Sequence, residues 1–178
     1  MPNRAGALTL CLLVYATPLL AQSPHACEDL RSLSLANTVV TTAAVVNGSF
    51  TPPGAANPSA TISNLPAFCR VAATLKPTAD SEINTEIWLP MKNWNRKLQS
   101  VGNGAWAGTI PFGAMASAVS TGYATAGTDT GHTGNTASFV PGHPERLVDY
   151  GYRAVHEMTV VAKAIVRAFY GDGPRYSY

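Results

Sequence analysis

The sequence has few charged residues. Asp, Glu, Lys and Arg together make up 12% of its 178 residues, and the formal net charge is only +2. A nucleic-acid-binding domain ordinarily concentrates basic residues on one face, so the composition argues against a nucleic-acid partner. A disordered chain would need low hydrophobicity and high charge, whereas 46% of these residues are hydrophobic. The composition predicts a globular domain with its own core.

Familiar catalytic motifs are also missing. No GxSxG segment, which carries the nucleophile of α/β-hydrolases, occurs in the sequence. The segment HEMTV starts like the zinc-binding HExxH motif, but Val160 stands where the second histidine is required. His156 and Glu157 are therefore expected on a helix surface or in an interface. The residues present supply no recognisable hydrolase triad.

An apolar run near the N-terminus predicts export. Arg4 precedes the apolar residues 5–20, and Ala21 follows as a small residue suited to cleavage. The run is short for a transmembrane helix, and no stop-transfer pattern follows it. We expect a signal peptide over residues 1–21, a mature domain over 22–178, and a secreted or periplasmic protein free of the membrane. An uncleaved anchor is the alternative.

Only three cysteines are present. Cys11 falls in the predicted signal peptide, which leaves Cys27 and Cys69. An even pair in an oxidising compartment predicts a disulfide between them. Two buried free thiols are the alternative.

The mature chain begins with strand signals and continues with alternating strands and helices. Residues 27–69 are rich in Thr, Ala and Val around a Pro/Gly segment, which suggests short strands and an irregular loop. Strands alternating with helices predict a parallel sheet of the α/β type, with the chemistry at the carboxyl ends of the strands. The expected elements are strands at 68–77, 81–90, 98–101 and 123–132, a helix at 115–123 and a loop at 138–151.

The clearest helix covers residues 152–170. Gly171 is placed to end it, and residues 175–178 read as the opening of a further strand. Apolar residues recur at intervals of three and four positions and predict one buried stripe. The stripe consists of Val155, Met158, Ala162, Ile165, Val166 and Phe169.

A glycine-rich loop, GNGAWAG, follows the strand at 98–101. It does not fit the dinucleotide pattern GxGxxG, because Ala107 stands where the third glycine should be, and it lacks the Lys-Ser/Thr of a phosphate loop. Two interpretations remain. The loop is a tight turn that needs positive φ, or it supplies main-chain amides to an oxyanion.

A polar segment, TDTGH, ends the strand at 123–132. Asp129 and His132, together with His143, could suggest a metal site, but their spacing matches no established ligand pattern. The alternative is a hydrogen-bonded polar cluster at the strand end, with no metal in this chain, and we favour it.

Two long segments resemble the tannase/feruloyl esterase family. They are VGNGAWAGTIPFGAMASAVSTGYATAGTDTGH and GHPERLVDYGYRAVHEMTVVAKAIVRAFYGDGPRYSY, and the likeness extends from Cys27 to Tyr178. Members of the family are secreted α/β-hydrolases with a large lid, and they cleave esters of aromatic acids. The resemblance implies a serine esterase acting on feruloyl esters of plant cell walls or galloyl esters of tannins.

The resemblance also assigns roles to single residues. GNGAWAG is similar to the loop that donates one oxyanion-hole amide, from Asn103 or Gly104. Most members carry a glycine where this chain has Ala105. Cys27 and Cys69 match the family's N-terminal disulfide. Asp129 and His132 match a strand-end motif that we expect to shape the site without catalysing the reaction.

The rest of the family's machinery is expected beyond Tyr178. In the family, a strand like the last residues here leads into the nucleophile elbow, and the acid, the histidine base and a lid with a structural calcium follow. The resemblance therefore implies a partial hydrolase sheet and a polypeptide that is inactive alone. The alternative is a secreted module that binds carbohydrate or aromatic ligands without catalysis, with Trp88, Trp94 and Trp106 as stacking platforms.

Overall fold

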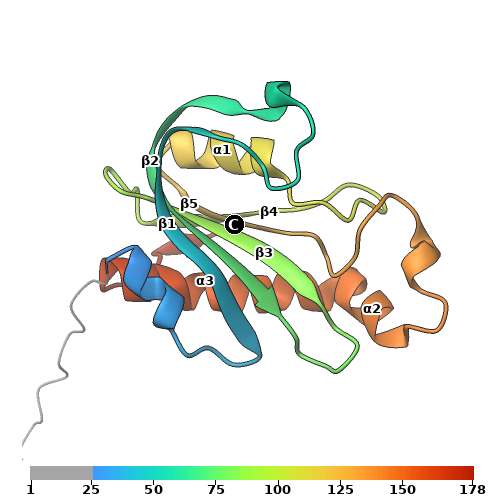
Figure 1. Cartoon of the computed structure of the whole chain (residues 1–178). Helices are drawn as coiled ribbons and strands as arrows, with labels where there is room; N and C mark the ends of the chain where they lie inside the picture. Colours follow the sequence, from blue (N-terminus) through green and yellow to red (C-terminus); the bar gives the residue numbers. More distant parts are fainter. Residues whose placement is uncertain (1–25) are drawn as a thin grey trace, which may run out of the picture.

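One six-stranded sheet forms the centre of the protein, in the order β1-β2-β3-β5-β4-β6 (Figure 1). The computed structural model describes residues 26–178, so the predicted signal peptide lies outside the described residues. The strands are β1 (Thr38–Phe50), β2 (Ile62–Leu75), β3 (Ile83–Pro90), β4 (Lys97–Val101), β5 (Ala124–Thr128) and β6 (Tyr176–Ser177).

The sheet is mixed, so the expectation of a parallel sheet is only half right. β1, β2, β3 and β5 pair in antiparallel fashion, whereas β4 pairs in parallel with β5 and with β6. The first three strands follow one another through turns that reverse the chain. After β4 the chain passes through helices between strands, which lets the next strand run in the same direction. The α/β class is confirmed.

Helices cover both faces of the sheet. α1 (Phe112–Ser120) lies on one face and α3 (Ala154–Tyr170) on the other (Figure 1). Two separate buried clusters correspond to these faces, one containing Trp88 and Met115 and the other containing Met158 and Ile165. The shorter helical segments are 3₁₀ turns at Glu28–Ser32, Pro58–Ala60 and Ala137–Phe139, α2 (Pro144–Val148) and a π turn at Asp149–Arg153.

The N-terminal part differs from the short strands expected there. β1 has 13 residues and β2 has 14, and they form one long hairpin. The pairing register shifts between Val40 and Thr42 and again between Val46 and Ser49. Bulges of this kind break the alternation of buried and exposed residues, which hides the length of the strands in the sequence.

Residues 81–90, expected as a strand, show no regular alternation of apolar and polar side chains. In β3 all residues except Asn84 are buried, because α1 and α3 cover its two faces. A strand buried on both faces has no solvent side that must be polar, and its buried Thr85 and Glu86 are paired with the Gly127 carbonyl and with Arg70, so no alternation is required.

The long helix is confirmed, and it ends as predicted. Gly171 has φ 76°, and its N–H donates to the carbonyl of Arg167. Val155, however, is 42% exposed, so its place in the buried stripe is wrong. Ala154 and Val161 are buried instead. The π turn in front of α3 changes the phase of the helix at its first residues.

Residues 138–151, expected as a loop, contain α2 and the start of the π turn. Pro144 occupies the first turn of α2, where a missing N–H costs nothing. The predicted disulfide is confirmed: Cys27, next to the first 3₁₀ turn, is bonded to Cys69 on β2 with a Cα–Cα distance of 5.6 Å. Across residues 26–178, no helix is both long and apolar enough to cross a membrane.

Candidate functional site at the ends of two parallel strands

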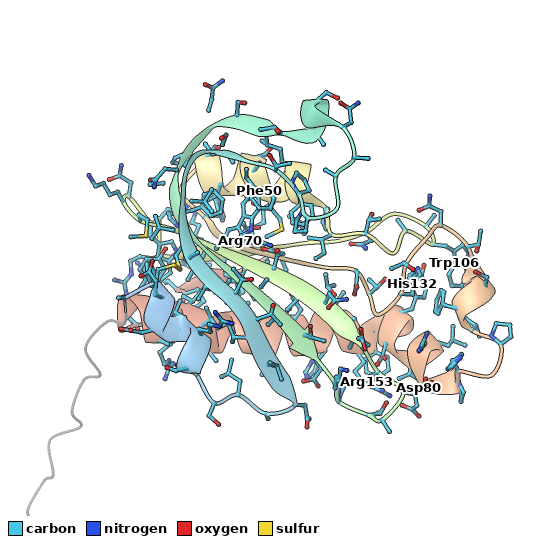
Figure 2. All side chains as sticks on the ribbon, in the orientation of Figure 1. Phe50, Arg70, Asp80, Trp106, His132 and Arg153 are labelled. Carbon is cyan, nitrogen blue, oxygen red and sulfur yellow. A yellow bond between two sulfur atoms is a disulfide. The ribbon has the colours of Figure 1, made fainter. Side chains whose placement is uncertain are left out.

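The two segments singled out in the sequence meet at one edge of the sheet. β4 ends at Val101 and β5 ends at Thr128, and because these strands are parallel their carboxyl ends lie together. The glycine-rich loop at 102–108 leaves the first strand, and the Asp129–His132 turn leaves the second. Figure 2 shows Trp106 and His132 side by side where the two loops meet.

Hydrogen bonds within the glycine-rich loop fix its shape. The N–H of Ala107 donates to the carbonyl of Gly104 at 3.1 Å and closes a turn in which Ala105 has φ 45°. The side-chain Nδ2 of Asn103 donates to the carbonyls of Ala107 (2.8 Å) and Thr109 (2.9 Å). The amide side chain of Asn103 is therefore committed to the loop. Its Oδ1 is buried without a hydrogen-bond partner among the described residues, so the main-chain N–H is the donor that Asn103 has left for a ligand.

The main-chain amides of Asn103 and Gly104 are available. Within residues 26–178, neither N–H group has a hydrogen-bond acceptor. Gly104 is exposed and Asn103 is half-buried. The positive φ of Ala105 confirms the tight turn. Free amides on a fixed loop are the arrangement that can stabilise a developing oxyanion, so Asn103 and Gly104 stay the predicted donors.

Asp129 anchors the turn after β5. It is buried, and its Oδ1 accepts from the N–H groups of Asn84 (3.0 Å) and Gly131 (2.8 Å), while Oδ2 accepts from Asn84 Nδ2 (2.8 Å). Burial raises the pKa of Asp129, and the hydrogen bonds from Gly131 and Asn84 partly oppose this. All of these partners are structural, so the carboxylate ties β5 to the start of β3.

His132 joins the two loops. It is buried, and its Nε2 donates to the carbonyl of Trp106 at 3.0 Å, which requires the proton on Nε2 because a carbonyl can only accept. Its Nδ1 lies 3.2 Å from the hydroxyl of Thr130, and its ring stacks on Phe139 at 3.9 Å. Nε2 is therefore committed to the glycine-rich loop, and Nδ1 faces a hydroxyl that itself donates to the carbonyl of Asp129 at 2.6 Å.

Two contacts of the site were not predicted from the sequence. Gly108 touches His132 so closely that a β-carbon there would lie 2.5 Å from the histidine carbonyl oxygen. Tyr150, in the π turn, donates its hydroxyl to the carbonyl of Ala105 at 2.6 Å. Both lie in segments that the family resemblance rests on, but no local pattern indicates that either touches the other loop.

The third member of the possible metal group lies elsewhere. His143 Nδ1 is 2.7 Å from Asp80 Oδ1 in the turn between β2 and β3, and Arg146 Nε lies 3.4 Å from the same carboxylate and donates to the carbonyl of Asp80. In the described part of the chain, no three His, Cys, Asp or Glu residues come close enough to hold a metal ion. His156 is exposed on α3, as predicted.

Two cavities adjoin the strand-end loops, and both are lined in part by Asn84 and Asp129. One, of about 420 Å³, also has His132, Phe139 and Arg146 in its wall. The other, of about 640 Å³, lies over β1, β2 and β3 beside residues 108–112. Concave space therefore lies on both sides of the Asp129 turn.

The three tryptophans have different surroundings. Trp88 is fully buried and stacks on Phe68, so its proposed role as an exposed platform is wrong. Trp94 stacks on Tyr170 at 3.9 Å and is half-buried. Trp106, within the glycine-rich loop, is 38% exposed, and it is the one tryptophan of the three with a large accessible surface.

Comparison with known proteins finds esterases of one family. The sequence profile of the family described as tannase and feruloyl esterase matches residues 69–178. An uncharacterized esterase of Xanthomonas campestris pv. campestris is 40% identical over 161 residues, which cover 89% of this chain and 27% of that protein. Feruloyl esterase B of Aspergillus niger is 40% identical over 111 residues, which cover 62% of this chain and 21% of that enzyme.

Solved structures agree with the sequence comparison. The crystal structure of feruloyl esterase B from Aspergillus oryzae superposes with a TM-score of 0.77 and 35% identity, covering 85% of this chain and 30% of that one. Tannin acyl hydrolase from Aspergillus niger superposes with a TM-score of 0.58 at 23% identity, which shows a shared fold. The chain spans about a quarter of the length of the curated relatives described here.

Proposed function

Because the chain belongs to the tannase and feruloyl esterase family, we propose that it forms part of a serine-type carboxylic ester hydrolase acting on esters of aromatic acids. Feruloyl esters are the first candidates, since several relatives are named feruloyl esterase B. Galloyl esters of tannins are the second. The substrates are small aromatic esters or the same esters on plant cell-wall sugars and tannins.

The observation that carries the proposal is the pair of free amides on the glycine-rich loop. When a serine oxygen adds to an ester carbonyl, negative charge develops on the carbonyl oxygen. The N–H groups of Asn103 and Gly104 lack acceptors within the described residues and follow a parallel strand, where such donors are needed. Either amide can donate to the oxyanion. The second donor of the hole would follow the nucleophile.

Asp129 and His132 have supporting roles in this proposal. Asp129 holds the turn after β5 through three hydrogen bonds, and His132 holds the carbonyl of Trp106. Neither side chain needs to gain or lose a proton during the reaction. Their substitution should therefore lower the rate by displacing the loop, without changing the order of the chemical steps.

The exposed ring of Trp106 supports the preference for an aromatic acid. It stacks on Tyr150 at 4.5 Å and keeps 38% of its surface accessible next to the oxyanion loop. An aromatic acyl group bound with its carbonyl at the loop would find an apolar ring within the same region.

The nucleophile, the acid and the base are proposed to lie outside these 178 residues. An oxyanion loop without a nucleophile forms no acyl-enzyme, so this polypeptide alone should hydrolyse no ester by the serine route. The test is release of alcohol from a chromogenic feruloyl ester by the purified chain. A burst stoichiometric with this polypeptide would refute the proposal.

To test the proposed enzyme, the DNA beyond the Tyr178 codon is sequenced and the whole open reading frame is expressed. We expect it to cleave methyl ferulate or methyl gallate with a kcat/KM at least about tenfold above that for an aliphatic ester of similar size. A preference for the aliphatic ester, or no nucleophilic serine in the frame, would contradict the assignment.

Export is part of the proposal. The disulfide is consistent with an oxidising compartment, as is the apolar run at residues 5–20. N-terminal sequencing of the protein from its native source should begin near residue 22. A mature protein that still starts at Met1 and sediments with membranes would support the uncleaved anchor.

A ligand-binding module without catalysis remains the second candidate, because Trp106 is accessible. That function predicts saturable quenching of tryptophan fluorescence when ferulic acid or a xylan oligosaccharide is added to this chain. The change should disappear in W106F. Equal quenching of wild type and W106F would remove this candidate.

A further inference from the structure

Tyr150 links two segments that lie 45 residues apart in the sequence, the π turn and the glycine-rich loop. We propose that Tyr150 is a positioning residue that holds this loop in the conformation leaving the amides of Asn103 and Gly104 free. This inference rests on the proposed esterase function of the loop. It adds a residue outside the loop to the machinery of that reaction.

The loop needs a restraint because Ala105 has an unfavourable backbone conformation. Ala105 is the second residue of the turn closed by Ala107 N–H and Gly104 carbonyl, and its φ is 45°. Turns with positive φ at this position ordinarily carry glycine there, because a β-carbon crowds the neighbouring carbonyl. An alanine persists in such a conformation only where its surroundings determine it.

Three consecutive carbonyl groups of the turn each accept a hydrogen bond. Ala107 N–H holds the carbonyl of Gly104 at 3.1 Å. The Tyr150 hydroxyl holds the carbonyl of Ala105 at 2.6 Å, and His132 Nε2 holds that of Trp106 at 3.0 Å. The middle bond is the one that acts on the strained residue itself, so its loss leaves Ala105 free to relax.

The phenol ring is itself well fixed. It stacks on Trp106 with the ring centroids 4.5 Å apart and the planes at 22°, and it packs edge-on against His132 at 5.5 Å. The preceding residue, Asp149, is fully buried and accepts from Arg153 at 3.0 Å, which anchors the π turn below the ring. A hydroxyl on a ring held from two sides loses little freedom when it bonds the loop.

The substitution Y150F tests the bond and keeps the ring. In the complete esterase, we expect kcat to fall about tenfold while KM changes by less than about twofold, because the oxyanion donors act mainly in the transition state. Y152F is the matched control: Tyr152 lies in the same turn, is 65% exposed and makes no side-chain hydrogen bond within the described residues. Y152F should retain wild-type kcat.

The substitution A105G distinguishes a tyrosine that positions the loop from one that only stabilises the fold. Gly adopts positive φ without crowding, so a turn with glycine at position 105 needs no restraint. In an A105G background, Y150F should lower kcat by less than about threefold. A tyrosine that only supports the fold would cost the same in both backgrounds. Equal losses would overturn the proposal.

A readout in this chain alone does not depend on activity. The N–H groups of Ala107 and Gly108 donate within the two loops, to Gly104 and Gly134, so their hydrogen exchange reports opening of the turn. Y150F should speed the exchange of these two amides about tenfold and leave the exchange of the β5 amides unchanged. Y152F should change neither rate. Unchanged exchange in Y150F would overturn the positioning role. A complete polypeptide that hydrolyses no ester would overturn the esterase proposal and leave the exchange result standing.

Discussion

A β-carbon added to Gly108 would lie 2.5 Å from the carbonyl oxygen of His132 and 2.7 Å from its imidazole Cδ2. The glycine-rich loop and the turn after β5 therefore touch through a position that has no room for a side chain. The backbone bridge between Gly108 and Gly134 continues this contact. The relative placement of the two loops depends on this close approach.

The substitution G108A should separate the loops. Backbone and ring atoms of His132 cannot both move away without breaking the hydrogen bond to Trp106, so we expect a loss of about 2–4 kcal/mol in the free energy of unfolding. Urea unfolding followed by tryptophan fluorescence measures this loss. G102A is the matched control, because a β-carbon there meets no atom within 4 Å. Equal stabilities of the two variants would contradict the close contact.

Removal of the disulfide should destabilise the protein strongly. The bond between Cys27 and Cys69 spans 42 positions, for which the loss of chain entropy in the unfolded state corresponds to about 4 kcal/mol. Urea unfolding with and without reductant should show this difference. The variant C27S/C69S should unfold like the reduced protein and should not respond to reductant. A response in that variant would assign the effect to another group.

Loss of the Arg70 guanidinium should leave a buried charge behind. Glu86 has a side-chain exposure of 3% and accepts from Arg70 and from the indole N–H of Trp88. R70M should cost about 3–5 kcal/mol in unfolding free energy, because the carboxylate then lacks its counter-charge. In R70M/E86Q most of the loss should return, since the amide oxygen can still accept from Trp88.

The control for the buried Arg70–Glu86 pair is the exposed ion pair of Lys76 and Glu82. Lys76 and Glu82 are 3.1 Å apart with side-chain exposures of 59% and 61%, so water screens their attraction. K76M should leave the urea midpoint almost unchanged. If K76M lost as much unfolding free energy as R70M, burial of the ion pair would not determine the loss of stability.

The titration of Asp129 should make stability depend on pH. Burial raises its pKa above the ordinary value of 3.8, so the folded state keeps this proton at pH values where the unfolded chain has lost it. Asp129 therefore contributes most to stability below pH 3.8, the pKa of the unfolded chain, and its contribution declines as the pH rises through the folded pKa. D129N lacks this titration and serves as the reference. The unfolding free energy of wild type minus that of D129N should fall as the pH rises above 3.8. A difference that rises over this range would contradict the direction of the shift.

Local patterns predicted a large part of the fold. The three- and four-residue spacing of apolar side chains identified α3, and Gly171 identified its end, because both signals depend on residues within one or two turns. The predicted export signal and the even cysteine count led to the correct disulfide. The two loops of the site were found because strand ends carry the polar and glycine-rich segments of α/β proteins.

Other features could not be read from the chain. The bulges that lengthen β1 and β2 arise from pairing between strands, and the burial of β3 on both faces arises from α1 and α3 packing on it. The short α2 and the π turn lie in a segment with proline, glycine and charged residues, where no periodic pattern is long enough to indicate a helix.

The sequence by itself determined the α/β class, the disulfide and the family, since each depends on composition, short-range spacing or a run of matching residues. The tertiary structure decided how the candidate site is held. The hydroxyl of Tyr150 on the carbonyl of Ala105, and His132 on that of Trp106, join residues 45 and 26 positions apart. Such contacts exist only after the sheet brings the ends of β4 and β5 together, and no local preference of the chain encodes them.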